Sequence, residues 1–153
     1  MTIGSHDERW MRAALDEAEL ALAHDDVPVG AVAVWQEKII GRGHNQRERD
    51  KDPTAHAEMT ALRQAAHYLN RWRLGDVTLY CTLEPCCMCA GAIVLARVPR
   101  VVYAAIDQKA GCAGSIVDLL RHHRLNHRVD VDVGLMADEA ASLLHSFFLQ
   151  RRA

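Results

Sequence analysis

The chain has 153 residues, of which half are apolar and a quarter are charged, and its formal net charge at pH 7 is −2. This composition is ordinary for a globular protein, and a chain of this length fits one domain that buries roughly two-thirds of its unfolded surface, so we expect a single domain over residues 1–153. The charge excludes a globally basic nucleic-acid binder, and any contact with RNA must come from a local patch.

Targeting signals and cysteine usage favour the cytoplasm. No apolar run approaches the ~20 residues that a membrane span requires, and we expect neither a secretory leader nor a membrane partner. The five cysteines are an odd number, and two of them form a C-x-x-C pair. This usage favours a reducing compartment and metal binding over a disulfide framework.

The N-terminal part of the chain predicts a helix. Ser5 and Glu8 have the spacing of a capping box, and apolar residues then recur at helical spacing to about residue 23. Trp10 lies on this apolar stripe, so we expect it in the core rather than in a binding site.

A β-hairpin is predicted next. Residues 27–35 are a nearly unbroken, valine-rich apolar run, which is typical of a strand covered on both faces. A short turn leads to a second strand that opens at residues 39–40, and so short a link makes the pair antiparallel. The charged stretch 44–52 is predicted to be a solvated loop.

Helices and strands alternate through the rest of the chain. A strand, a helix and a strand in succession predict a parallel pair joined by a right-handed crossover. The elements expected here are a helix over 55–69, a strand over 77–82, a helix over 86–96, strands over 101–106 and 129–133, and a helix from about 137. Ala140, Leu143, Leu144, Phe147 and Phe148 follow the helical period closely, so we expect this face of the last helix in the core.

The segment after the strand at 101–106 is a candidate pocket wall. Ligands in open α/β sheets gather at the carboxyl ends of strands, which favours a binding role for Asp107. A structural interpretation is equally open for this loop, and in it Ser115 with Asp118 caps a helical turn over 116–120. Cys112 is not expected to bind a metal, because a fourth protein ligand would close a position that hydrolysis needs.

The chemistry is concentrated at Cys86 and Cys89. Their spacing places both sulfur atoms on one face of a helix, where they can bind a single ion. Pro85 suits the first helical position, and the positive end of the helix would favour the thiolate form that a metal requires. Cys87 is turned about 100° from Cys86 and cannot share a face with Cys89.

His56 is a plausible third ligand. Three protein ligands leave one position for water, which is the arrangement of catalytic zinc sites. Glu58 follows two residues later, and both side chains could face one ion if a helix began near residue 55. Residues 52–54, Asp-Pro-Thr, are a credible start signal there.

The H-x-E and P-C-x-x-C motifs together are similar to the signature of zinc nucleobase deaminases. The chain as a whole resembles the bacterial tRNA-specific adenosine deaminases, which convert the wobble adenosine of an anticodon to inosine. The resemblance runs from about Trp10 to Arg152, and Cys87 departs from it, because relatives usually carry another residue there. The segments that carry it are residues 52–58 (DPTAHAE), 82–86 (TLEPC), 88–92 (MCAGA), 111–115 (GCAGS) and 126–128 (NHR).

The resemblance implies a fold, a cofactor and partners. The fold is a three-layer α/β/α cytidine-deaminase-like domain with a five-stranded mixed sheet. The cofactor is one Zn²⁺ per subunit on His56, Cys86 and Cys89, with Glu58 moving protons between water, the purine ring and the departing ammonia. The implied partners are the tRNA anticodon stem-loop and a second copy of the chain.

The resemblance also implies residues that contact the substrate. Asn45 matches an asparagine that hydrogen-bonds the target base, and an amide can pair with a purine edge. The last helical turn would lie beside the anticodon loop, where Phe148 would stack and Arg151 would meet phosphates. A structural interpretation, with Phe148 in the core and Arg151 at the negative end of the helix, remains open.

Two alternatives remain. The same zinc motif fits a deaminase of a free base or nucleoside, of the guanine or cytosine type. A structural zinc in a nucleic-acid-binding module is less favoured, because structural sites are normally closed by four Cys or His ligands.

Overall fold

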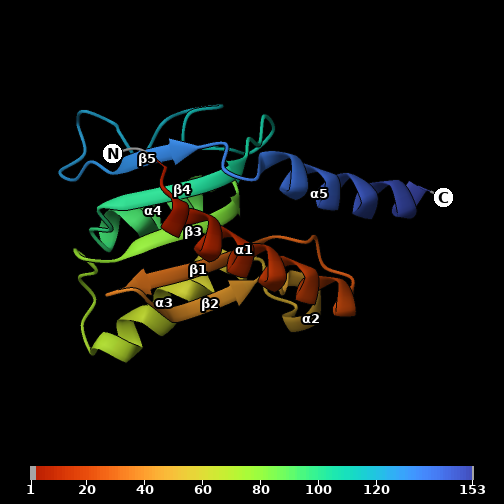
Figure 1. Cartoon of the computed structure of the whole chain (residues 1–153). Coiled ribbons are helices and arrows are strands. Elements are labelled where there is room, and N and C mark those ends of the chain that lie inside the picture. Colours follow the sequence, from red (N-terminus) through yellow and green to blue (C-terminus); the bar gives the residue numbers. More distant parts are fainter. Residues whose placement is uncertain (1–2, 153) are drawn as a thin grey trace.

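A computed structural model describes residues 3–152 as an α/β fold built on one five-stranded sheet (Figure 1). The strands are β1 (Gly30–Trp35), β2 (Lys38–His44), β3 (Thr78–Leu83), β4 (Arg100–Ala105) and β5 (Asp130–Val133). The helices are α1 (Ser5–Leu20), α2 (Arg47–Asp50), α3 (Ala57–Leu69), α4 (Cys87–Leu95) and α5 (Ala137–Arg152), and a 3-10 turn, η1 (Ala21–His24), follows α1.

The sheet is mixed. Its strand order is β2-β1-β3-β4-β5, with β1 antiparallel to both β2 and β3, while β3, β4 and β5 run parallel. The predicted hairpin, the parallel pair β3–β4 and the five-stranded mixed sheet are therefore confirmed.

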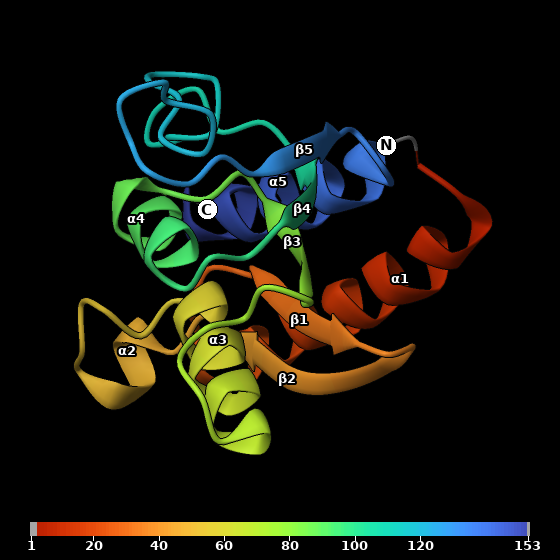
Figure 2. The same ribbon diagram turned by 90° about the vertical axis from the view of Figure 1, so that its left-hand side faces the viewer.

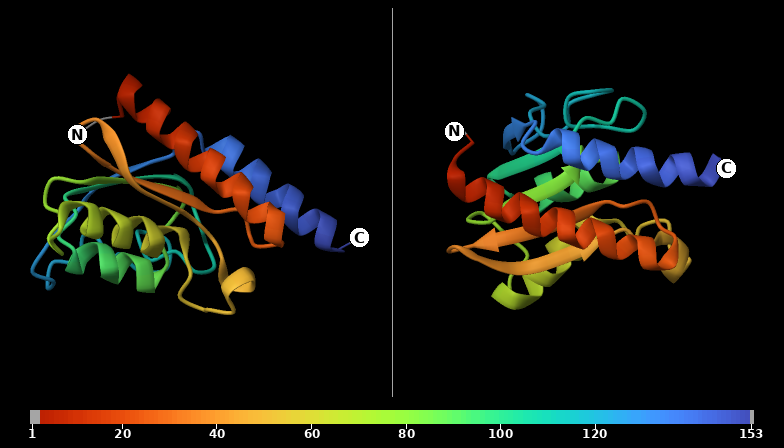
Figure 3. Two further views of the ribbon diagram at one scale, coloured as in Figure 1. Left: turned by 90° about the horizontal axis from the view of Figure 1, so that it is seen from below. Right: turned by 45° about the vertical axis from the view of Figure 1, so that its right-hand side comes forward.

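Helices cover both faces of the sheet, so that the molecule has three layers (Figure 3). The α1 and α5 helices lie on one face, and α3 and α4 lie together on the other (Figure 2). Each face of the sheet has its own apolar core, and strand β1 contributes to both. Ala31 and Ala33 pack on the side of α3, while Val32 and Val34 pack on the side of α1. The prediction of a strand buried on both faces is confirmed.

Strand β1 begins at Gly30, three residues later than the apolar run 27–35 predicts. The chain turns first, because the N–H of Val29 donates to the carbonyl of Val27 at 2.9 Å. Glycine is required at the start of the strand, since a Cβ atom there would lie 2.0 Å from the carbonyl oxygen of Ala14 in α1. This close approach sets how tightly α1 packs on the sheet.

The start of α1 differs from its prediction. The N-cap residue is Gly4, and its N–H donates to Oδ2 of Asp7 at 2.9 Å. The predicted capping box of Ser5 and Glu8 is therefore wrong by one residue. Asp7 takes this position because its buried carboxylate also has partners on the sheet. Trp10 is buried, as predicted.

Helix α3 starts later than predicted. Its N-cap residue is His56, whose backbone is extended, and the first helical residue is Ala57. The proposed start signal at 52–54 folds into a local turn instead, because Oδ1 of Asp52 accepts hydrogen bonds from both the N–H and the hydroxyl of Thr54.

Helix α4 is also displaced by one residue. Cys86 is its extended N-cap residue and Cys87 its first helical residue, so Pro85 precedes the helix and does not occupy its first position. Tertiary contacts decide this start. Cys86 forms a β-bridge with Gly111, and the carbonyl of Pro85 accepts a hydrogen bond from the N–H of Cys112 at 2.8 Å.

Two further local predictions are wrong. The stretch 44–52 is not only a solvated loop, because it contains the one-turn helix α2, whose N–H groups bind the buried Asp26. No helical turn forms over residues 116–120, which the structure describes in full. The hydroxyl of Ser115 donates to Glu84 instead of capping such a turn.

Candidate functional site

A cavity of about 630 Å³ lies where the start of α3 and the start of α4 approach the loop that follows β4. Its volume is in the range of small-molecule sites. Its wall comes from residues before β1 (Val27, Val29), around the start of α2 (Asn45, Arg47), at the start of α3 (His56, Ala57, Glu58), between β3 and α4 (Leu83, Glu84, Cys86), after β4 (Ile106, Asp107, Gln108, Lys109, Ala110) and in α5 (Leu144, Phe148).

His56 and Cys86 line this cavity, and the buried Cys89 meets them behind its wall. Their ligand atoms all lie within 4.8 Å of one another, and Nδ1 of His56 is 3.5 Å from Sγ of each cysteine. His56 and Cys86 are both N-cap residues with extended backbones, so the first turns of α3 and α4 present them to each other.

The donor set and its spacing fit a zinc ion. In a tetrahedral site with ordinary zinc–sulfur and zinc–nitrogen bonds, the sulfur and nitrogen atoms are about 3.6 Å apart. The observed distances of 3.5 Å agree with this value. Within residues 3–152, no fourth Cys, His, Asp or Glu joins the group. Cys87 is exposed, and Cys112 is buried outside the group.

Hydrogen bonds join the three residues to one another. A hydrogen bond from the thiol of Cys89, helped by His56, lowers the pKa of Cys86 to about 3 against the effect of burial. The hydrogen bond to Cys86 raises the pKa of His56, and the same cysteine together with burial raises the pKa of Cys89 far above its usual range. A metal ion would replace these protons, because zinc binds the thiolate and the neutral imidazole.

Glu58 is the buried carboxyl group beside this cluster. Its side chain lies in the first turn of α3 and is only 4% exposed. Burial raises the pKa of Glu58 to about 7, although His56 and a hydrogen bond from Cys89 work in the other direction. A carboxyl group with a pKa near neutrality can both accept and release a proton, as a general acid–base catalyst must.

Asn45 lines the cavity from the segment after β2. It is 5% exposed, its N–H donates to the carbonyl of Val29 at 3.1 Å, and its Oδ1 accepts from the N–H of Arg47 at 3.2 Å. These bonds fix the side chain at the edge of the cavity.

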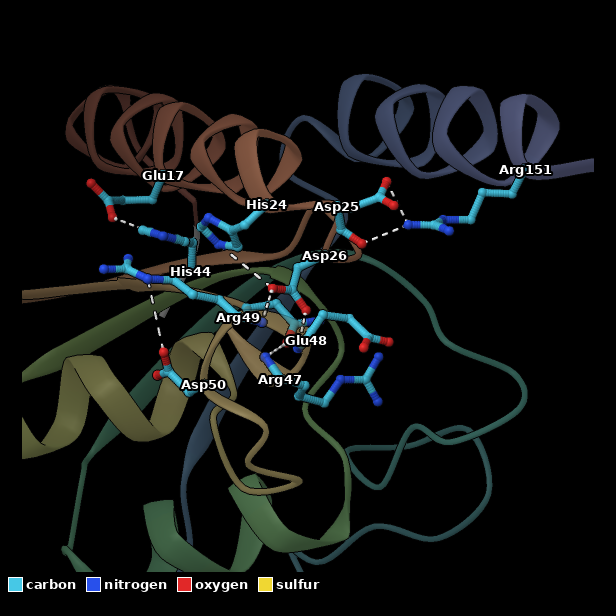
Figure 4. A network of polar contacts seen from close by, with 11 residues as sticks. Glu17, His24, Asp25, Asp26, His44, Arg47, Glu48, Arg49, Asp50 and Arg151 are labelled. Atoms are coloured by element: carbon cyan, nitrogen blue, oxygen red, sulfur yellow. Dashed lines mark hydrogen bonds and ion pairs between the residues drawn. The ribbon is translucent and has the colours of Figure 1, made fainter.

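Arg47 is a cavity residue that the sequence interpretation missed, since it assigned the charged residues of this stretch to a solvated loop. A network beneath α2 holds it in place (Figure 4). Asp26 is 1% exposed, and its carboxylate accepts hydrogen bonds from the N–H groups of Glu48 at 2.7 Å and Arg49 at 3.3 Å. Asp26 lies 22 positions before Glu48, so no local sequence signal reveals the contact.

Of the two residues of α5 that are predicted to contact substrate, Phe148 lies at the cavity and Arg151 does not. Phe148 lines the cavity and is 47% exposed, so its predicted place in the core is wrong, whereas Phe147 is buried. Arg151 is not among the cavity residues. It donates to the carbonyl of Asp25 at 2.6 Å and pairs with the carboxylate of the same residue (Figure 4).

Asp107 lines the cavity from the loop after β4. Its Oδ1 accepts hydrogen bonds from the N–H groups of Lys109 at 3.0 Å and Ala110 at 3.1 Å, which form a tight turn. The structure therefore brings Asp107 to the cavity and also gives it the structural role that the sequence left open. Glu84, which organises this loop, is a second residue that the sequence interpretation missed.

Known proteins resemble this chain over nearly its whole length. The family model of the MafB19-like deaminases matches residues 5–152. The tRNA-specific adenosine deaminase of Streptococcus pyogenes serotype M18 (strain MGAS8232) is 48% identical over 143 residues, which cover 94% of this chain and 90% of that protein. The tRNA-specific adenosine deaminase of Bacillus subtilis (strain 168) is 45% identical over 148 residues, which cover 97% of this chain and 92% of that protein.

Solved structures agree with these sequence relatives. A structure from a study of A-to-I editing by tRNA:A34 deaminases at the wobble position of transfer RNA superposes with a TM-score of 0.85 at 42% identity, covering 89% of this chain and 99% of that one. The guanine deaminase from Nitrosomonas europaea superposes with a TM-score of 0.77 at 24% identity, covering 96% and 86% of the two chains, and shares the fold.

Proposed function

We propose that this chain, which belongs to the MafB19-like deaminase family and is a tRNA adenosine deaminase, converts the wobble adenosine of a tRNA anticodon to inosine. The observation that carries the proposal is the placement of the buried Glu58 in one cavity with His56 and Cys86, whose ligand atoms meet that of the buried Cys89. The net reaction adds water to adenosine and releases ammonia.

The proposed cofactor is one zinc ion per subunit, held by His56, Cys86 and Cys89. The agreement between their distances and those of a tetrahedral site supports this assignment. Bound zinc supplies Lewis acidity, which brings the pKa of a coordinated water towards ~7.

Glu58 is proposed to carry the protons of the reaction. Its carboxylate takes a proton from the attacking water and gives one to the purine ring nitrogen next to C6. It then takes the proton of the hydroxyl group formed at C6 and delivers it to the departing amino group, which leaves as ammonia while C6 becomes the carbonyl carbon of inosine. Burial of Glu58 supports this role, because a raised pKa makes the protonated form available at neutral pH.

Four residues are proposed to contact the RNA. The amide of Asn45 pairs with the edge of the base, and Asp107 contacts it from the loop after β4. Phe148 stacks on a base near the cavity mouth, since half of its side chain is free to do so. Arg151 meets phosphate at the end of α5, where RNA would compete with its exposed partner Asp25.

The proposed partners follow from this site. An anticodon loop offers bases that are already unstacked, which lowers the cost of placing one in the cavity. We also propose a homodimer that acts in the cytoplasm. In the part of the chain that the structure describes, no helix is long and apolar enough to span a membrane.

Inosine formation on a transcribed tRNA with adenosine at the wobble position tests the proposal. The matched control is the same tRNA with guanosine at that position, which should yield no inosine. Free guanine, cytosine and adenosine are assayed in parallel for ammonia release. Activity on the free compounds and none on the tRNA would contradict the proposal and favour the free-base or nucleoside alternative.

A cobalt-substituted sample tests the metal assignment separately. Cobalt(II) reports its coordination by absorption spectroscopy, and a three-ligand protein site should retain exchangeable solvent. A spectrum typical of four protein ligands would favour the structural-zinc alternative.

A further inference from the structure

We propose that Glu84 is a positioning residue, which fixes the cavity wall formed by residues 106–110 and so sets where the substrate base sits. This inference rests on the proposed function, because it concerns the same cavity. Glu84 lies between β3 and α4, two residues before Cys86, and its side chain is 2% exposed.

The carboxylate of Glu84 is fully engaged by the loop that follows β4. Oε1 accepts hydrogen bonds from the N–H of Asp107 at 3.0 Å and from the hydroxyl of Ser115 at 2.5 Å. Oε2 accepts from the N–H groups of Ala113 and Ser115, each at 3.0 Å. All four partners are donors, so the loop matches a group with two acceptor oxygens, and a carboxylate is the side chain that provides them.

These bonds hold both ends of the segment 107–115, which is the first part of the loop. Asp107 opens the segment and Ser115 closes it, while the residues between them include Lys109 and Ala110 of the cavity wall. This segment contains no helix and no regular strand, and although Cys112 and Ala113 are buried in the core, residues 108–110 of the cavity wall are exposed. Hydrogen bonds to a buried carboxylate are therefore a major part of what sets its position.

Gly111 gives independent support. A Cβ atom on Gly111 would lie 2.3 Å from Cδ of Glu84 and 2.5 Å from the carbonyl oxygen of Asp107. The loop backbone thus wraps closely around the carboxylate, and any larger residue at this position would displace one or the other.

Glu84 acts through the loop and not on the substrate. Although its side chain lines the cavity, both carboxylate oxygens are occupied by loop donors. The same loop is attached to the metal-binding segment by the hydrogen bond from Cys112 to Pro85. Glu84 therefore sets the distance between the wall at 106–110 and the residues that hold the metal.

The substitution Glu84→Gln tests this role, because glutamine keeps the shape but turns one acceptor oxygen into a donor. We expect hydrogen exchange at the amides of Asp107, Ala113 and Ser115 to be about tenfold faster or more, in line with the loss of a hydrogen bond to a charged group. We expect kcat/KM for tRNA to fall about tenfold, mainly through KM, with zinc retained at one per subunit. Glu19→Gln makes the same chemical change at an exposed position and is the matched control.

A second variant guards against misfolding of the first. Ser115→Ala removes one of the four bonds and leaves the carboxylate in place, so it should shift the same amides and KM in the same direction by a smaller factor. Exchange and KM within twofold of the wild type in both variants would overturn the inference. Loss of zinc from either variant would also overturn it, because Glu84 would then act on the metal site. If the wild-type protein forms no inosine, the proposed function fails, while the exchange data still decide whether Glu84 holds the loop.

Discussion

Glu58 follows His56 by only two positions, and yet both side chains line the same cavity. Residues two apart in a regular helix point away from each other. Here His56 has an extended backbone (φ −88°, ψ 151°) and Glu58 lies in the first turn of α3, so the change of conformation at the helix start turns both inward. The imidazole of His56 and the carboxyl group of Glu58 belong to separate residues, so a substitution can remove one group and leave the other in place.

Replacing Glu58 should separate metal binding from catalysis. Glu58→Gln removes the proton carrier and leaves His56, Cys86 and Cys89 intact. We expect one zinc per subunit and a fall in kcat of about 10²–10⁴-fold, which is the usual contribution of a general acid–base group. Metal analysis and single-turnover inosine formation measure the two quantities. Near-normal turnover would show that another group moves the protons.

Adjacent cysteines provide a matched pair for the metal site. Cys86→Ala removes a sulfur that lies 3.5 Å from Nδ1 of His56, and we expect it to lose both zinc and deamination. Cys87→Ala changes an exposed thiol outside the group and should keep both. Zinc content, measured after dialysis against a weak chelator, distinguishes them. Equal zinc loss in the two variants would contradict the assigned ligand set.

The spacing of the motifs is enough to predict that His56, Cys86 and Cys89 lie together, though not the local geometry that brings them there. Cys86 and Cys89 were expected on one face of a helix, but Cys86 is the N-cap residue. They still meet, because the third helical residue lies next to the N-cap position. The existence of the strands, the antiparallel hairpin and the parallel pair β3–β4 were likewise predictable from the sequence pattern, whereas helix starts depended on tertiary hydrogen bonds.

The residues that escaped prediction are held by distant partners. Arg47 reaches the cavity because Asp26, far away in the sequence, binds the start of α2. Glu84 gains its role from donors in the loop after β4. Glu84 stands within the motif at 82–86, but neither residue's neighbours in the sequence reveal its partners, because these are brought close only by the folded sheet.

A buried ion pair should make the protein sensitive to acid. Asp7 is 5% exposed, and its carboxylate accepts hydrogen bonds from Arg100 at 2.9 and 3.0 Å and from the hydroxyl of Tyr80. Burial alone would raise the pKa of Asp7, but these hydrogen bonds outweigh it and lower the pKa to about 2, compared with 3.8 for a free carboxyl group.

Because the pKa of Asp7 is lower in the folded protein than in the unfolded chain, the free energy of unfolding decreases as the pH falls. The stabilisation, about 2 kcal/mol, is fully present above pH ~4 and is lost as the pH falls towards ~2, where the folded protein also becomes protonated. Asp7→Asn should lower the free energy of unfolding at pH 7 by a similar amount, and its difference from the wild type should shrink between about pH 4 and 2. Urea unfolding at a series of pH values measures this.

Glu139→Gln, in an exposed pair with Arg12, is the control and should change stability by less than ~1 kcal/mol. A constant difference between wild type and Asp7→Asn down to pH 2 would contradict the assignment.

Alanine substitutions of two neighbouring phenylalanines on α5 should affect different properties, stability for Phe147 and tRNA binding for Phe148. Phe147 is 7% exposed, and the guanidinium of Arg151 lies 4.6 Å from the centre of its ring, whereas Phe148 is 47% exposed and lines the cavity. Phe147→Ala leaves a void under the helix and should lower the free energy of unfolding by about 3 kcal/mol or more. Phe148→Ala should change stability by much less. It should raise KM for tRNA about fivefold or more, because stacking of a base on an aromatic ring contributes about 1–3 kcal/mol.

Urea unfolding and steady-state kinetics on both variants give the comparison. An unchanged KM in a stable Phe148→Ala protein would exclude this ring from the RNA-binding surface and leave α5 with a structural role.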